Sequence, residues 1–141
     1  TISGNDTIIG GATSWTGVHQ TTPLGTAATA TGLSSEAPSV TVTSAVNDVV
    51  IDALGVITAP VTTEGAGQTV RYDLAEGASE TGSGSSEAGA ASVVMSWTLD
   101  PGQGWATVGV SMKPSAAGAA AALFAQQTIW RGIGRGIYQG R

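Results

Sequence analysis

The chain has 141 residues and a formal net charge of −5, and only 11% of its residues are charged, against about 25% in an average globular protein. This acidic balance argues against a nucleic-acid partner, which would select a basic face. Cysteine is absent, which excludes disulfides and thiolate metal sites. No apolar run reaches the roughly 18 residues of a membrane span. The abundance of Thr, Ser and Gly instead predicts a β-rich, secreted or cell-surface protein of about one domain.

Two segments in the first half of the chain have clear strand patterns. Residues 39–43 alternate hydroxyl and valine side chains, which is the period of a half-buried strand. Residues 49–56 form a more continuous apolar run, which predicts a central strand covered on both faces. The other segments are predicted as one or two strands in residues 1–16 broken at Gly10 and Gly11, a turn at residues 18–23, and a loop or edge strand at residues 26–37.

The second half of the chain predicts three more strands. Residues 69–74 place Val70, Tyr72 and Leu74 on one face, and Arg71 and Asp73 on the other. Residues 92–99 and 105–112 both alternate, and the intervening Asp100-Pro101-Gly102 is a turn sequence, so the pair is predicted to form a hairpin. Residues 75–91 are rich in Gly and Ser without periodicity, which predicts a long mobile surface loop.

The composition changes after residue 114, which divides the chain into a predicted β-sandwich domain, residues 1–114, and a C-terminal unit, residues 115–141. Residues 115–127 are rich in alanine and predict a short helix. Residues 128–141 contain three of the five basic residues and alternating glycines, which favour an extended strand supported by a neighbour. We predict that side chains of this tail contact a second subunit, namely Ile129, Trp130, Arg131, Ile133, Arg135, Ile137 and Tyr138.

Several motifs lie in the order found in one group of proteins. Residues 14–25 read SWTGVHQTTPLG, residues 67–72 read GQTVRY, and residues 95–99 and 105–114 read MSWTL and WATVGVSMKP. Over residues 8–114 the chain resembles β-sandwich modules of large bacterial extracellular surface proteins. The resemblance implies an antiparallel, jelly-roll-like or lectin-like sandwich.

Two departures from that pattern shape the prediction. His19 stands where the family commonly has Asp, so the role of that carboxylate does not carry over. The family module also has earlier strands that the chain does not supply. A sandwich without them would expose apolar edges and faces, so we expect either the tail or a strand from a neighbouring subunit to complete it, the second by β-augmentation.

No catalytic or cofactor site is predicted. His19 is the only histidine and no Gly-x-Ser-x-Gly elbow is present, so a structural role in a turn is favoured. The carboxylates fall mostly in predicted turns and in the predicted loop, where solvated acids are ordinary, which disfavours a glycosidase. Calcium is a minor alternative, because loops can gather oxygen ligands but no Asp-x-Asp-x-Asp sequence occurs.

The tryptophans leave a choice between packing and binding. Trp97 and Trp105 lie in alternating strands and are predicted to pack in the sheet. Trp130 is the better candidate for an exposed contact. The sequence therefore predicts an extracellular, self-associating structural protein, such as a filament or surface-layer subunit assembled by strand complementation. The alternative is a carbohydrate-binding or adhesive module of a larger surface protein.

Overall fold

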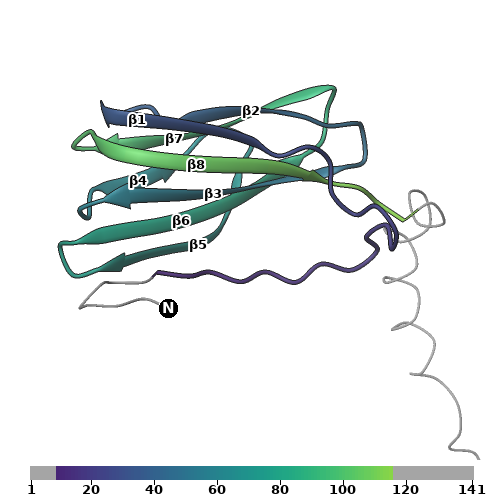
Figure 1. The fold of residues 1–141 in the computed structure, drawn as a ribbon, viewed down its shortest axis with the longest axis horizontal. Coiled ribbons are helices and arrows are strands. Elements are labelled where there is room, and N and C mark those ends of the chain that lie inside the picture. Colours follow the sequence, from purple (N-terminus) through teal and green to yellow (C-terminus); the bar gives the residue numbers. More distant parts are fainter. Residues whose placement is uncertain (1–8, 116–141) are drawn as a thin grey trace, which may run out of the picture.

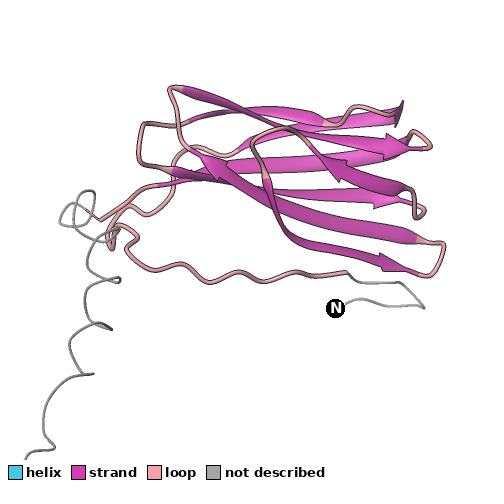
Figure 2. Ribbon diagram, turned by 180° about the vertical axis from the view of Figure 1, so that it is seen from behind, coloured by secondary structure: helices cyan, strands magenta, loops and turns pink. Residues whose placement is uncertain are grey.

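The computed structural model describes residues 9–115 of the chain. Over this range the protein is a β-sandwich of eight antiparallel strands in two sheets, with no helix (Figures 1 and 2). The all-β prediction is therefore confirmed. The predicted helix at 115–127 and the tail at 128–141 lie outside the described residues, apart from Ser115.

The two sheets differ in width. The larger sheet has the order β1-β8-β3-β6-β5 and the smaller has the order β2-β7-β4. The strands are β1 (Ala28–Ser35), β2 (Ser39–Thr43), β3 (Val49–Ile57), β4 (Val61–Glu64), β5 (Thr69–Glu76), β6 (Glu80–Ala88), β7 (Ser92–Asp100) and β8 (Gln103–Met112).

The core lies between the sheets in two apolar clusters. One cluster gathers Val40 and Val42 of β2, Val50 of β3, and Val93 and Met95 of β7. The other cluster consists of Leu54, Val56, Trp97 and Leu99, with Trp105 packed against it. The alternation read in residues 39–43 and 92–99 therefore identifies the buried face correctly in both strands.

The predicted hairpin of residues 92–99 and 105–112 is wrong, although both strands exist. β7 pairs with β2 and β4, whereas β8 pairs with β1 and β3, so Pro101 and Gly102 carry the chain from one sheet to the other. Alternation along a strand shows which side chains face a core but not which strand is its neighbour. Here the inner faces of β7 and β8 approach the same core from opposite sheets.

The predicted mobile loop at residues 75–91 is also wrong. Most of it is β6, which pairs with both β3 and β5 inside the larger sheet. Ser83 and Ser85 are buried, and their hydroxyls make hydrogen bonds inside the sandwich. Glycine and serine here belong to a strand because partners on both sides supply the order that their own propensity lacks.

The chain before β1 borders the larger sheet. The turn predicted at residues 18–23 is present. Isolated bridges at its two ends, Leu24 to Met112 and Val18 to Pro114, hold it to the last residue of β8 and to the residues just after it. Residues 9–16 form no strand, so the strand prediction fails for this part. They run beside β5 as an extended segment (Figure 1).

Candidate binding groove on the larger sheet

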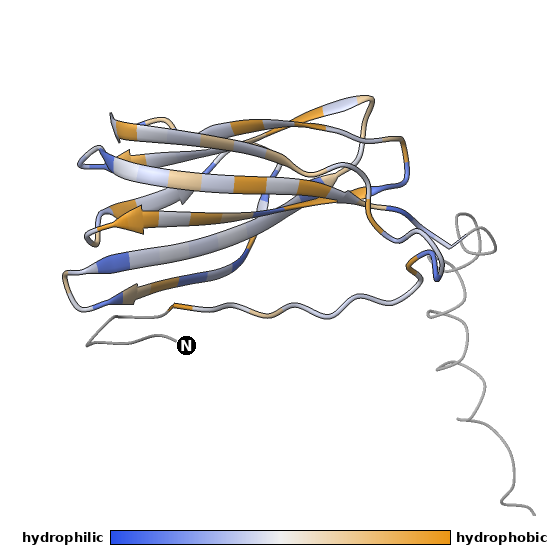
Figure 3. Ribbon diagram, in the orientation of Figure 1, coloured by the Kyte–Doolittle hydropathy of each residue, from blue (hydrophilic) through white to orange (hydrophobic). Residues whose placement is uncertain are grey.

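The outer face of the larger sheet is unusually apolar along two neighbouring interior strands, β3 and β8. Along β3 the inner residues Val50, Leu54 and Val56 are buried, while Ile51 and Ala53 on the outer side are half-buried. Ile57 continues this outer row and is 60% exposed. The sequence predicted a strand covered on both faces, but within residues 9–115 only one face is fully covered. Figure 3 shows the apolar bands along β3 and β8.

Apart from Trp105, which packs against the core, strand β8 places its apolar residues outward and its polar residues inward. Thr107 and Ser111 are buried toward the smaller sheet, at 5% and 2% exposure. Val108, on the outer side, is 39% exposed, and Ala106 beside it is also exposed. Because solvent-facing positions of a sheet are normally polar, this inversion marks the outer face as a surface that suits an apolar partner.

Small residues make this face hollow. Gly55 of β3 pairs with Gly82 of β6 on one side and with Ala106 of β8 on the other, so three adjacent strands carry almost no side chain in one row. The hollow over them has a volume of about 910 Å³. A smaller hollow of about 180 Å³ continues past Ala53 toward Val108. We call the two together the outer groove.

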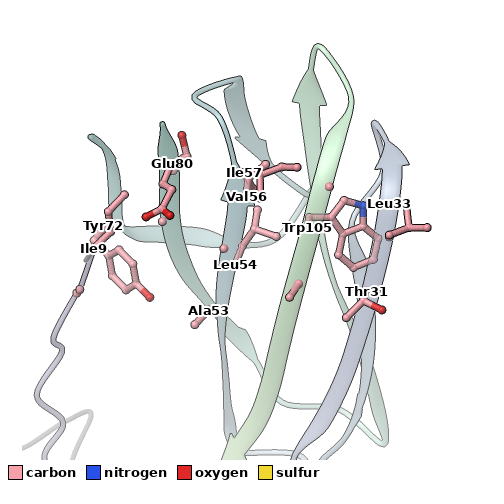
Figure 4. Close-up of a pocket in the computed structure, with 18 residues that line it drawn as sticks. Ile9, Thr31, Leu33, Ala53, Leu54, Val56, Ile57, Tyr72, Glu80 and Trp105 are labelled. Atoms are coloured by element: carbon pink, nitrogen blue, oxygen red, sulfur yellow. The ribbon is translucent and has the colours of Figure 1, made fainter. Parts of the chain in front are cut away.

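Ile9 and Tyr72 border the outer groove on one side, and Leu33 borders it on the other, with Ala53 and Ile57 between them (Figure 4). The Tyr72 ring lies between the backbones of Gly11 and Gly84. It is so close to both that a Cβ on either glycine would collide with the ring. The Ile9 side chain would collide with a Cβ on Gly82. Residues 9–11 are thus fixed against the sheet by contacts that only glycine permits.

Next to this border, Arg71 lies 5.0 Å from the centre of the Trp15 ring and donates a hydrogen bond to Ser86 Oγ. Asp73 instead accepts hydrogen bonds from Thr62 and Ser83. The two side chains were predicted to share a face. A register irregularity between Val70 and Tyr72 separates them, because the extra residue disrupts the alternation.

Burial, and to a lesser extent the charge of Asp52, raise the pKa of Tyr72 above its ordinary value of 10.0. An unfolded chain releases this proton at the ordinary pKa, so the contribution of Tyr72 to stability is complete below about pH 10 and falls as the pH rises through the folded pKa. We expect Tyr72→Phe to unfold with a weaker pH dependence in this alkaline range. Urea unfolding across that range checks this. An unchanged pH dependence in the variant would contradict it.

A buried polar network crosses the sandwich behind the outer groove. Asp52 of β3 is 7% exposed. Its Oδ1 accepts hydrogen bonds from the backbone N–H and the hydroxyl of Ser85, at 2.7 and 2.8 Å. Its Oδ2 accepts the indole N–H of Trp97 at 2.7 Å. Gln68 extends the network by donating to Ser85 Oγ and accepting the backbone N–H of Ser96.

Sequence reasoning missed this network. Asp52 was predicted to lie in the strand of residues 49–56 but was given no structural role, although its position in the middle of an apolar strand was the available signal. A carboxylate buried between apolar neighbours requires donors, and Ser85, which supplies two of the three, lay in the segment predicted as a loop. Each hydrogen bond of Asp52 comes from a protein donor, on β6 of the larger sheet or on β7 of the smaller sheet. This arrangement matches a structural carboxylate that bridges the two sheets.

His19 lies in the turn, where its Nδ1 accepts the backbone N–H of Thr22 at 3.1 Å, which agrees with a structural role. Among the described residues, no group of three or more His, Asp or Glu side chains is placed to hold a metal ion, and no helix is long and apolar enough to cross a membrane. The seven predicted interface residues of the tail, 129–138, lie outside the described residues.

Comparison with protein-family models, curated proteins and solved structures finds no match to the chain. The resemblance to bacterial surface modules therefore stays a prediction. Over the described residues the protein is thus an all-β sandwich with a polar interior bridge and an apolar groove on the outside of its larger sheet.

Proposed function

We propose that the protein is an extracellular structural subunit that associates with copies of itself by β-strand complementation, as in a filament or surface layer. The observation that carries this proposal is the outer groove, where β3 and β8 present apolar side chains that no described residue covers. Large exposed apolar patches are typical of association surfaces. The low charge and the hydroxyl-rich composition support an extracellular location.

Two exposed valines on opposite faces provide a matched test. Val108 lies on the outer face of the larger sheet and Val94 on that of the smaller sheet, at 39% and 54% exposure. We expect Val108→Lys to weaken self-association of the full chain about tenfold or more, because burying an unpaired ammonium group is unfavourable. Val94→Lys should associate like the wild type. Light scattering over a concentration series measures both.

Circular dichroism and urea unfolding establish that both variants stay folded. Equal association of the two lysine variants would contradict the proposal that the outer groove is the association surface. A wild type that remains monomeric at every concentration, with no filaments in electron micrographs, would contradict self-association itself.

A carbohydrate-binding or adhesive role is the second candidate. The half-buried Trp15, whose ring lies 5.0 Å from Arg71 beside the outer groove, favours it, because sugar rings can pack on aromatic faces. The largely apolar floor of the groove favours self-association more. Glycan-array binding by a monomeric wild type, lost in Trp15→Ala, would support the second candidate.

A further inference from the structure

We infer that the outer groove receives the C-terminal segment of a second copy, residues 128–141, as an extended strand. This inference rests on the proposed self-association and adds the acceptor and the donor. Three properties of the described residues carry it: the unpaired backbone beside the groove, the shape of the floor, and the charge at one end.

Residues 9–16, which lie beside the outer groove, have backbone groups with which an added strand could pair. Residues 9–16 are extended, yet none of them makes a backbone hydrogen bond to another residue of the described range 9–115. Tyr72 nevertheless holds the segment in place at Gly11. An extended segment that has no backbone partner among the described residues resembles the edge of a sheet. A strand entering the outer groove can pair with it, which is how augmented strands gain affinity.

The floor of the groove accommodates side chains of a strand. The row of Gly82, Gly55 and Ala106 leaves a depression across three strands, and Ile57 and Val108 provide apolar surface along it. In an extended segment, side chains at every second position point to the same side. Ile129, Ile133 and Ile137 would then share one side of the donor, with a spacing of about 13 Å.

Charge favours this donor. Glu76 and Glu80 are direct cross-strand partners where β5 turns into β6, and Glu80 lines the groove. Like charges placed opposite each other are destabilising. The 26 residues outside the described range at the C-terminal end, 116–141, contain three arginines and no acid. In an extended donor, Arg131 and Arg135 would share the side of the isoleucines, where their guanidinium groups would be attracted to the glutamates.

The direction of the chain favours a second copy over the same one. The groove lies over the beginning of β8, near Trp105 and Ala106. The chain leaves the sandwich past the other end of β8, where Ser115 donates a backbone hydrogen bond to Gly17. To fill its own groove it would have to reverse direction, whereas a neighbour placed end to end receives it directly. Such a head-to-tail contact is heterologous and continues into a filament or closes into a ring.

The absence of cysteine from the chain permits disulfide trapping in the full-length protein. One population carries Val108→Cys and a second, distinguished by a mass tag, carries Ile133→Cys. After mixing and mild oxidation, we expect a cross-linked heterodimer that disappears on reduction. The matched control replaces the first population with Val94→Cys, on the opposite face, and should give a several-fold lower yield.

The double variant Val108→Cys/Ile133→Cys separates the two ways of filling the groove. We expect it to form a ladder of cross-linked multimers. A product linked within one chain would overturn donation to a second copy. Equal heterodimer yields with Val108→Cys and Val94→Cys would overturn the groove as acceptor while self-association still stands, because light scattering would still detect it. Monomers throughout would overturn self-association as well.

Discussion

Replacing Asp52 with alanine is expected to lower the free energy of unfolding by about 3–5 kcal/mol. The carboxylate is buried and accepts the backbone N–H of Ser85 and the indole N–H of Trp97, both at 2.7 Å. Each buried donor left without a partner costs about 1–3 kcal/mol. The Ser85 hydroxyl can rotate to another acceptor, so the two N–H groups dominate the loss.

Two further variants locate the effect. Asp52→Asn keeps one acceptor oxygen but turns an NH₂ group toward a donor, so we expect an intermediate loss of about 1–3 kcal/mol. Glu76→Ala removes an exposed carboxylate that lies opposite Glu80, so it should not lower the stability and should raise it by less than about 1 kcal/mol. Urea unfolding followed by tryptophan fluorescence compares all three. An Asp52→Ala protein as stable as Glu76→Ala would contradict the structural role of the network.

The strands with strict alternation could be predicted from the sequence, and their partners could not. The alternation in residues 39–43 and 92–99 identified the buried valines and Met95, because the period of a strand shows which side chains share a face. The hairpin prediction failed because a short connection such as Pro101-Gly102, between Asp100 and Gln103, can join neighbours in one sheet or cross to the other sheet. The choice between these two connections depends on how the inner faces of β7 and β8 pack on the shared core, which the local sequence does not reveal.

Strand β6 could not be predicted because its order comes from its neighbours. Gly82 and Gly84 lack the side chains that give a strand its pattern, and Ser83 and Ser85 are buried polar residues that are satisfied only in the folded sandwich. The outer groove follows from the same residues. A segment of glycines that resembles a loop in sequence becomes the floor of a groove when β3 and β5 hold it in a sheet.

Trp97 and Trp105 were predicted to pack alike in the sheet, yet the structure separates them by the environment of the indole nitrogen. Trp97 donates its N–H to Asp52, whereas the N–H of Trp105 is buried without a partner among the described residues. Both rings pack at the same apolar cluster. Replacing each with phenylalanine therefore removes a similar apolar area but a different polar interaction.

We expect Trp97→Phe to lower the free energy of unfolding by about 1.5–3 kcal/mol, the contribution of a hydrogen bond to a charged group, and Trp105→Phe to lower it by less than about 1 kcal/mol. Urea unfolding of the two variants measures the difference. In an Asp52→Asn background the cost of Trp97→Phe should shrink, since residues that share one hydrogen bond are not additive, while the cost of Trp105→Phe should stay the same. If both substitutions lowered the free energy of unfolding equally in the wild-type background, the hydrogen bond from Trp97 to Asp52 would add nothing to stability. Ring packing alone would then account for the contribution of each tryptophan.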